Sequence, residues 1–281
     1  MSKTIIFIHG AWLAANSWDS FREYFASQGY ATLVPSWPSK ETSVDTLRAN
    51  PPEALAHLSA EEILEHYTRI IQQQTEPPIL IGHSFGGLFV QILLDRGLGA
   101  AGVAIDPAAP KGIMPPLIAF RALSGVLLTR GFWKKVVRMS FKQFQFGFVN
   151  GLPLEVQRAA YDTYVVPESG KLFSQAVNAA FDAHSPLTVN FHNATRAPLL
   201  LTAGTQDHTV PASQVTANYN KYRQTSARTD FLTFEGRTHW LIKQEGWEEV
   251  AKKIDTWLKD VGVGSTGPLP QSAEPSALPR D

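Results

Sequence analysis

The chain of 281 residues contains no cysteine. This absence excludes a thiol nucleophile, a framework of disulfide bonds and any metal site with cysteine ligands. Other metal and cofactor motifs are missing too, since there is no His-Glu-x-x-His, no P-loop and no Gly-x-Gly-x-x-Gly after a strand. We therefore expect a site that holds neither a metal nor a cofactor.

An excess of either charge is also absent, because 25 Lys and Arg balance 25 Asp and Glu. A neutral chain offers no long-range attraction to nucleic-acid phosphates or to anionic lipids. We therefore expect neither nucleic acid nor a membrane surface as a partner. The oligomeric state is unknown from the sequence.

Long apolar runs are missing as well, and none approaches the roughly 20 residues that a helix needs to cross a bilayer. The apolar segment 4–9 directly follows Lys3 and is too short for the apolar region of a signal peptide. These features predict a soluble, cytoplasmic protein without a membrane span. Residues 262–281 are rich in Gly, Pro, Ser and Ala and are predicted to be a disordered tail.

The chain does contain short apolar runs that alternate with helical patterns. Their hydrophobicity is continuous rather than alternating, which is typical of strands buried on both faces of a parallel sheet. Six runs are predicted to be strands: residues 4–9, 31–35, 78–82, 102–106, 198–203 and 230–234. The pattern predicts an α/β fold with a doubly wound, mostly parallel sheet.

Two predicted helices have clear signals in the sequence. Ser59-Ala60-Glu61-Glu62 is a capping-box pattern, which predicts that a helix begins here. From Gly246 to Leu258 the large apolar residues recur on one helical face, which predicts the last helix.

Residues 111–196 interrupt the alternation of strands and helices. They contain nine of the 16 phenylalanines and no run typical of a parallel strand. We predict that they form a helical cap inserted into an α/β core made of residues 1–110 and 197–261.

The predicted strand 78–82 runs directly into Gly82-His83-Ser84-Phe85-Gly86 and then into an apolar helical segment. This is the pattern of a nucleophile elbow, a strained strand-to-helix turn that exposes a serine. Gly82 and Gly86 fit the pattern because larger side chains would collide with the adjoining strand and helix. Ser84 is therefore the predicted nucleophile.

A serine hydroxyl needs a base within hydrogen-bond reach and a third group that orients the base. His239 follows the strand 230–234, and Asp207 follows the strand 198–203. Both loops lie at carboxyl ends of strands, where open α/β sheets bind their ligands. We predict His239 as the base and Asp207 as its orienting acid. Asp106, also at a strand end, is the alternative acid, although it also suits a turn before proline.

Hydrolysis of an acyl group also needs two fixed backbone donors for the oxyanion. Gly10 allows the loop after the first strand to approach Ser84 closely. The amides of Ala11 and Phe85 are therefore predicted to point at the same oxygen. Phe85 begins a helix, whose positive end also favours an anion.

Four aromatic residues are predicted to line an apolar substrate pocket. Trp12 and Trp240 directly follow the predicted oxyanion donor and base, while Phe144 and Phe146 belong to the phenylalanine-rich cap. The alternative is that they pack in the protein's own core, since large aromatic side chains are usually buried.

Four motifs together resemble those of a known superfamily. They are Phe7-Ile8-His9-Gly10-Ala11-Trp12, Gly82-His83-Ser84-Phe85-Gly86-Gly87, Gly204-Thr205-Gln206-Asp207-His208-Thr209-Val210-Pro211 and Gly236-Arg237-Thr238-His239. Through them, residues 4–258 resemble the α/β-hydrolase superfamily of serine hydrolases and, more distantly, its plant methylesterase and hydroxynitrile lyase branch. The resemblance implies the same nucleophile, acid, base and oxyanion donors as the residues predicted above.

The chain departs from three groups of the superfamily. Trp240 stands where the lyases have a lysine after the catalytic histidine, which counts against cyanohydrin cleavage. Ser84 stands where epoxide hydrolases and haloalkane dehalogenases carry aspartate. We therefore expect a carboxylic-ester hydrolase that acts on small apolar esters through an acyl-enzyme intermediate. A lactonase, a thioesterase or a cofactor-free perhydrolase on the same triad is an alternative, as is a non-catalytic ligand receptor on this scaffold.

Overall fold

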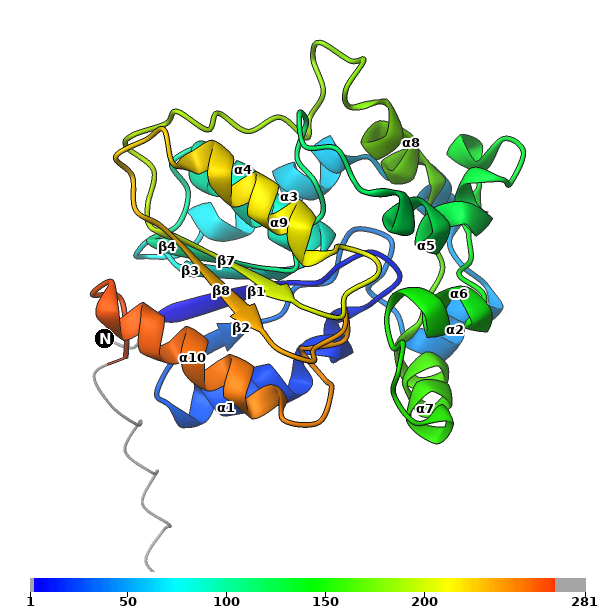
Figure 1. Cartoon of the computed structure of the whole chain (residues 1–281), viewed down its shortest axis with the longest axis horizontal. Coiled ribbons are helices and arrows are strands. Elements are labelled where there is room, and N and C mark those ends of the chain that lie inside the picture. Colours follow the sequence, from blue (N-terminus) through cyan, green and yellow to red (C-terminus); the bar gives the residue numbers. More distant parts are fainter. Residues whose placement is uncertain (1–2, 266–281) are drawn as a thin grey trace, which may run out of the picture.

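Six parallel strands form the central sheet of the computed structural model, which describes residues 3–265 (Figure 1). In order across the sheet they are β2 (Ala31–Leu33), β1 (Thr4–Ile8), β3 (Ile79–His83), β4 (Ala101–Ile105), β7 (Leu199–Gly204) and β8 (Thr229–Phe234). Each strand overlaps one of the six predicted runs, and all neighbouring pairs are parallel. The predicted fold class is confirmed. Of the predicted disordered tail, residues 266–281 lie outside the described residues.

The register of the sheet positions the loops that follow its strands. Gly82 of β3 pairs with Ile8 of β1 on one side and with Ala104 of β4 on the other. These three strands therefore end at the same edge, and the residues after each strand meet there.

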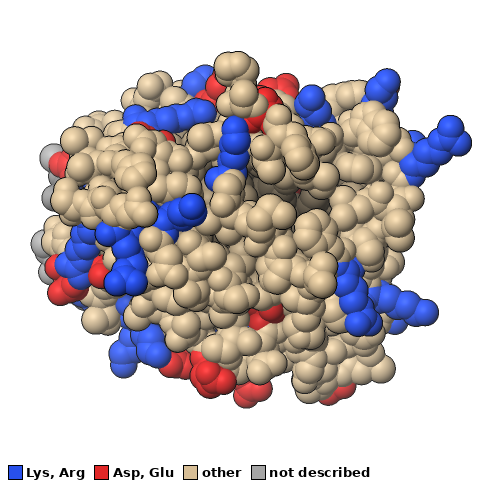
Figure 2. Space-filling view, turned by 45° about the horizontal axis from the view of Figure 1, so that its top comes forward, with Lys and Arg blue, Asp and Glu red and all other residues tan. Residues whose placement is uncertain are grey.

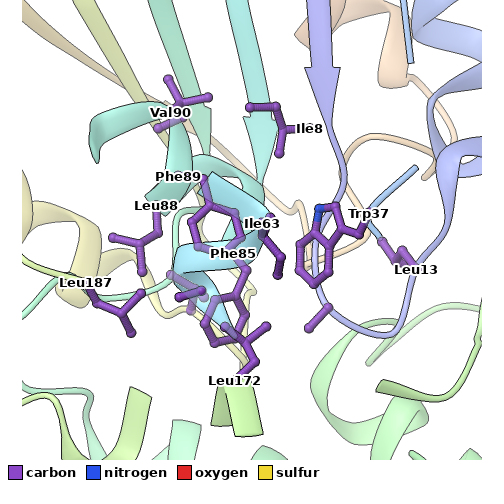
Figure 3. Packing of buried hydrophobic residues seen from close by; sticks show 14 of the residues in the cluster. Ile8, Leu13, Trp37, Ile63, Phe85, Leu88, Phe89, Val90, Leu172 and Leu187 are labelled. Carbon is purple, nitrogen blue, oxygen red and sulfur yellow. The ribbon is translucent and has the colours of Figure 1, made fainter. Parts of the chain in front are cut away.

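Alternate residues of the strands contribute to apolar cores on opposite faces of the sheet, because successive strand side chains point in opposite directions. Ile5 and Phe7 of β1 belong to one core, and Ile6 and Ile8 belong to the other. Helices α1 (Asp19–Ser27) and α10 (Trp247–Asp260) cover the first core, and α3 (Ala60–Gln72), α4 (Phe85–Asp95) and α9 (Ala212–Tyr222) cover the second (Figure 1). Figure 3 shows the second core, in which Phe85 and Phe89 of α4 pack near Ile8.

Both helix signals identified in the sequence are confirmed. The hydroxyl of Ser59 accepts a hydrogen bond from the amide of Glu62, and the carboxylate of Glu62 accepts one from the amide of Ser59. The predicted last helix corresponds to α10. A second capping box, made by Ser140 and Gln143, begins α6 (Phe141–Gly147). Our sequence analysis missed this Ser-x-x-Gln pattern.

The chain between β4 and β7 contains the remaining long helices, and we call its residues 111–196 the cap. Its elements are α5 (Leu117–Leu127), α6, α7 (Leu154–Tyr164), α8 (Gly170–Asn178) and a short antiparallel pair of strands, β5 (Val136–Val137) and β6 (Glu168–Ser169). The cap helices lie to the right of the sheet in Figure 1. The exact division between core and cap stays a prediction. Within residues 3–265, no helix is long and apolar enough to cross a membrane.

Candidate active site

Ser84 lies in a strained turn between β3 and α4. Its φ is 55° and its ψ is −119°, a conformation that residues with a side chain rarely adopt. A Cβ atom on Gly82 would lie 2.1 Å from the carbonyl oxygen of Gly86, and one on Gly86 would lie 2.0 Å from that of Ile8. The turn therefore requires glycine at both positions.

His239 and Asp207 form a buried hydrogen-bonded pair. Nδ1 of His239 donates to Oδ2 of Asp207 at 2.5 Å, and neither side chain is exposed. The other carboxylate oxygen of Asp207 accepts hydrogen bonds from the amides of Thr209 and Val210, each at 2.7 Å. These bonds fix the carboxylate and leave Nε2 of His239 as the proton acceptor of the ring.

The ring of His239 lies next to the residue that precedes Ser84. The ring centroids of His239 and His83 are 4.6 Å apart, and Nε2 of His83 donates to the carbonyl oxygen of His239 at 2.9 Å. Nε2 of His239 is buried and has no hydrogen-bond partner within residues 3–265, so it makes no bond with the Ser84 hydroxyl. Such catalytic bonds are often long without substrate and shorten when substrate binds.

Asp106, the alternative acid, lies beside Asp207 and does not bond to His239. It is fully buried with a φ of 42°, and its Oδ1 accepts a hydrogen bond from the amide of Gly204 at 3.1 Å. Burial, reinforced by the negative charge of Asp207, raises the pKa of Asp106 well above its usual range. Its Oδ2 is buried and has no hydrogen-bond partner among the described residues.

Asp106, Asp207 and His239 are also a cluster of potential metal ligands within the described residues, with one ligand atom from each within 4.8 Å of the others. Both oxygens of Asp207 and Nδ1 of His239 are already engaged in hydrogen bonds. Because these atoms are already hydrogen-bonded, the cluster is better described as an acid and base pair than as a set of metal ligands.

The amides of Ala11 and Phe85 are available as donors. Phe85 is the first residue of α4, so its amide has no acceptor inside the helix. Neither amide has a hydrogen-bond acceptor within the part of the chain that the structure describes. A Cβ atom on Gly10 would lie 2.9 Å from Cβ of Ser84, so glycine is needed where the loop passes the serine.

A buried ion pair holds the loop that carries Ala11. Nζ of Lys40 lies 2.5 Å from Oε2 of Glu168 in β6, and neither side chain is exposed. The same Glu168 oxygen accepts a hydrogen bond from the amide of Trp12 at 3.0 Å, and Lys40 donates to the carbonyl oxygen of Leu13 at 3.1 Å. Trp12 has a φ of 59°, so these contacts stabilise an otherwise unfavourable backbone conformation. Sequence analysis missed both charged residues because neither belongs to a recognisable motif.

Two further histidines are structural. Nδ1 of His9 donates to the carbonyl oxygen of Gly10 at 2.9 Å, and its Nε2 accepts a hydrogen bond from the amide of Trp37 at 3.3 Å. Burial lowers the pKa of His9 and, together with the nearby His239, that of His83. Both rings are therefore neutral near neutral pH.

A cavity of about 390 Å³ lies beside Ser84. Ala11 and Phe85 line it together with mostly apolar side chains, which include Trp12, Phe120, Leu123, Phe148 and Phe173. Its volume lies within the range of small-molecule pockets. The cavity therefore joins the serine and the two free amides to a space suited to an apolar ligand.

Of the four aromatic residues predicted for this pocket, Trp12 alone lines the cavity. Phe144 is fully buried and packs between other rings, with its centroid 5.8 Å from that of Trp240. Phe146 lies against His208, with centroids 4.9 Å apart. These three residues pack within the protein, as the alternative interpretation of large aromatics stated.

Phe148 and Phe173 are the cavity aromatics that sequence reasoning missed. Phe173 stacks on Trp12 at a centroid distance of 4.4 Å, and Phe148 meets the ring of His239 edge-on at 4.6 Å. Both are phenylalanines of the cap, but the sequence does not show which face of a cap helix turns toward the serine.

The sequence profile of the alpha/beta hydrolase family matches residues 5–253. No curated protein matches the chain. Similar solved structures include a monoacylglycerol lipase of Paleococcus ferrophilus, with a TM-score of 0.64, 23% identity and coverage of 92% of this chain and 94% of that one. A thermophilic esterase from Thermogutta terrifontis has a TM-score of 0.65, 18% identity and coverage of 93% and 91%.

A third similar structure is an extracellular alpha/beta-hydrolase from a Paenibacillus species, described as a structural and functional homologue of tobacco salicylic acid binding protein 2. Its TM-score is 0.64, with 19% identity and coverage of 90% of this chain and 98% of that one. At these identities the structures show a shared fold.

Proposed function

Because the chain belongs to the alpha/beta hydrolase family, we propose that it is a serine hydrolase that cleaves carboxylic esters of small apolar molecules. One observation supports this most directly. The strained Ser84, the buried pair of His239 and Asp207, and the free amides of Ala11 and Phe85 gather at one edge of the sheet, beside an apolar cavity.

In the first half of the reaction, Nε2 of His239 takes the hydroxyl proton of Ser84, and the serine oxygen attacks the ester carbonyl carbon. The amides of Ala11 and Phe85 donate to the resulting oxyanion. Collapse of the tetrahedral intermediate breaks the bond to the alcohol, which leaves with the proton from His239. The product at the enzyme is an acyl ester of Ser84.

In the second half, His239 takes a proton from water as the water oxygen attacks the acyl carbonyl carbon. Collapse of this second tetrahedral intermediate breaks the bond to the Ser84 oxygen, which takes the proton back from His239, and releases the acid. In each half His239 is positively charged once it has taken the proton, and the carboxylate of Asp207 stabilises that charge. The neutral state of His83 also matters, since a second positive ring 4.6 Å away would oppose protonation of His239.

The test is turnover of short-chain and medium-chain p-nitrophenyl esters by the wild type and by Ser84→Ala. We expect the variant to lose more than about 10⁴-fold in kcat, as for other catalytic serines. Ser124→Ala, at a half-buried serine of α5, serves as the matched control and should be fully active. Comparable turnover by Ser84→Ala and the wild type would remove Ser84 from the mechanism.

Labelling with a fluorophosphonate should modify Ser84 alone, which peptide mass spectrometry can locate. A panel that adds lactones, thioesters and a peracid assay then distinguishes the related reactions on the same triad. Absence of both labelling and turnover would favour the alternative of a non-catalytic receptor.

A further inference from the structure

The zero net charge of the chain, from which we expected no attraction to anionic lipid, is the sum of two unequal parts. Residues 107–154 contain seven of the 25 Lys and Arg and none of the 25 Asp and Glu. The rest of the chain therefore has 18 basic residues against 25 acidic ones. A segment with seven positive charges attracts anionic surfaces at short range even when the whole molecule is neutral.

The positive charges of this segment are not neutralised internally. None of the seven basic side chains forms an ion pair with a carboxylate within residues 3–265. The side chains that are exposed and without any hydrogen-bond or ion-pair partner in this part of the chain are those of Arg121, Arg130, Lys134, Arg138 and Lys142. On the right of Figure 2, where the cap lies, Lys and Arg side chains protrude and no Asp or Glu is seen above the lower edge.

Large apolar side chains are exposed on the same segment. Leu117 and Leu128, at the two ends of α5, are 87% and 85% exposed. Leu128 lies two residues before Arg130, and the half-exposed Trp133 directly precedes Lys134. Exposed apolar residues of this size commonly mark a surface that contacts a partner or a membrane.

This apolar surface continues into the cavity beside Ser84. Met114, Phe120 and Phe181 line the cavity and are also 74%, 41% and 90% exposed. They therefore form part of its rim, so exposed apolar side chains lie at the opening of the cavity. We call Met114, Leu117, Phe120, Leu128, Trp133 and Phe181, together with the seven basic side chains of residues 107–154, the rim surface.

We propose that the rim surface docks on anionic lipid, with the apolar side chains in the interface and the basic side chains against the headgroups. This arrangement of apolar and basic residues is the one by which proteins bind membrane surfaces without crossing them. A second copy of the chain fits this surface less well, because a symmetric contact would bring the same positive charges together. The cavity then opens toward the lipid, so an apolar ester reaches Ser84 without passing through water; this last step rests on the proposed function.

The experiment is sedimentation of the full-length protein with vesicles of phosphatidylcholine alone or mixed with phosphatidylglycerol. We expect binding to the anionic vesicles that is at least about tenfold tighter than to the neutral ones and that falls as salt rises. Equal binding to both vesicle types, or none to the anionic ones, would overturn the proposal.

Two double variants separate the components of the rim surface. Arg130→Glu with Lys134→Glu should weaken binding to anionic vesicles by about tenfold or more. Leu117→Ser with Leu128→Ser should weaken it as well, although neither leucine lines the cavity. The matched control is Lys221→Glu with Lys252→Glu, which makes the same charge change on α9 and α10 and should bind like the wild type.

Thermal unfolding of each variant checks that it is folded, and the substituted side chains are all exposed. Concentration-dependent dimers that Leu117→Ser with Leu128→Ser abolishes, without any vesicle binding, would show that a second copy occupies this surface. Sedimentation needs no turnover. An inactive protein that binds anionic vesicles therefore supports docking and contradicts the proposed function. An active protein that does not bind them contradicts docking and leaves the proposed function in place.

Discussion

Backbone strain at single residues is concentrated near the candidate site. Among the described residues, the non-glycine residues with a positive φ are Trp12, Ser39, Ser84 and Asp106. Trp12, Ser84 and Asp106 each follow a strand of the central sheet and lie near the cavity or the buried acids. Each such conformation costs about 1–3 kcal/mol and persists only where surrounding contacts fix it.

The glycines around Ser84 allow a prediction about the strained turn. Gly86→Ala should lower the free energy of unfolding by about 3 kcal/mol or more, because its Cβ would lie 2.0 Å from a backbone oxygen. Gly87→Ala is the matched control and should lower the free energy of unfolding by about 1 kcal/mol. The nearest contact of a Cβ atom on Gly87 would be a side-chain atom of Pro107 at 3.0 Å. Urea unfolding measures both, and equal losses would show that the backbone at Gly86 can move aside.

Substitution of Asp106 distinguishes the two possible acids. Asp106→Asn leaves the bond between Asp207 and His239 in place and should retain kcat within about threefold, whereas Asp207→Asn should lose about 10⁴-fold. If the losses were reversed, Asp106 would be the orienting acid. The measurement is ester turnover by the two purified variants.

Asp106→Asn should also change how stability depends on pH. Because the pKa of Asp106 is raised in the folded state, its stabilising contribution is complete below about pH 4 and is lost as pH rises toward the folded-state pKa. Relative to the wild type, the asparagine variant should therefore gain stability between about pH 4 and pH 7. A constant difference across this range would mean that Asp106 is ionised in the folded protein.

At the scale of elements, the cap contributes to the catalytic geometry as well as to the pocket. Glu168 in β6 holds both the amide of Trp12 and the ammonium group of Lys40. The amide of Val166, two residues before Glu168, also donates to the carbonyl oxygen of Trp12 at 2.9 Å. The position of the Ala11 amide therefore depends on how the cap packs against the loop after β1.

Glu168→Gln should destabilise the protein by about 3–5 kcal/mol, because the charge of the buried Lys40 loses its partner. We also expect kcat to fall by about 10- to 100-fold with little change in KM, as when an oxyanion donor is misplaced. Lys40→Met combined with Glu168→Gln should recover part of the stability. Glu249→Gln, which removes surface ion pairs with Lys253 and Arg237, is the control and should cost less than about 1 kcal/mol.

The elements differ in how well the sequence predicts them. The strands of the sheet pack between two apolar cores, so their sequences are apolar runs that a sequence pattern can identify. In the cap, the seven-residue α6 contains three phenylalanines, so an apolar pattern does not single out one face. Phe144, Phe146 and Phe148 follow one another along α6 and its end, and which of them faces the cavity depends on how α6 packs.

For the molecule as a whole, acid lability follows from the buried histidines. The folded state keeps His9 and His83 neutral, whereas the unfolded chain takes up protons below about pH 6.5. The stability that these residues contribute is therefore complete above about pH 6.5 and is lost as pH falls below it. Each contributes a slope of up to about 1.4 kcal/mol per pH unit.

Urea unfolding between pH 7.5 and pH 5 measures this loss in the wild type and in His83→Gln. The variant should lose less stability per pH unit, by up to about 1.4 kcal/mol. Substitution of the exposed His57 serves as the control and should leave the slope unchanged. An unchanged slope in His83→Gln would show that His83 is protonated in the folded state.

The sequence by itself determined the sheet and the position of the serine turn, because both depend on local chemistry. Buried strands require continuous apolar runs, and the turn at Ser84 requires small residues two positions away on each side. The tertiary structure decided which acid bonds to His239, how Lys40 and Glu168 hold the loop at Trp12, and which aromatic rings line the cavity. These features depend on contacts between residues far apart in the chain, and no local sequence pattern predicts such contacts.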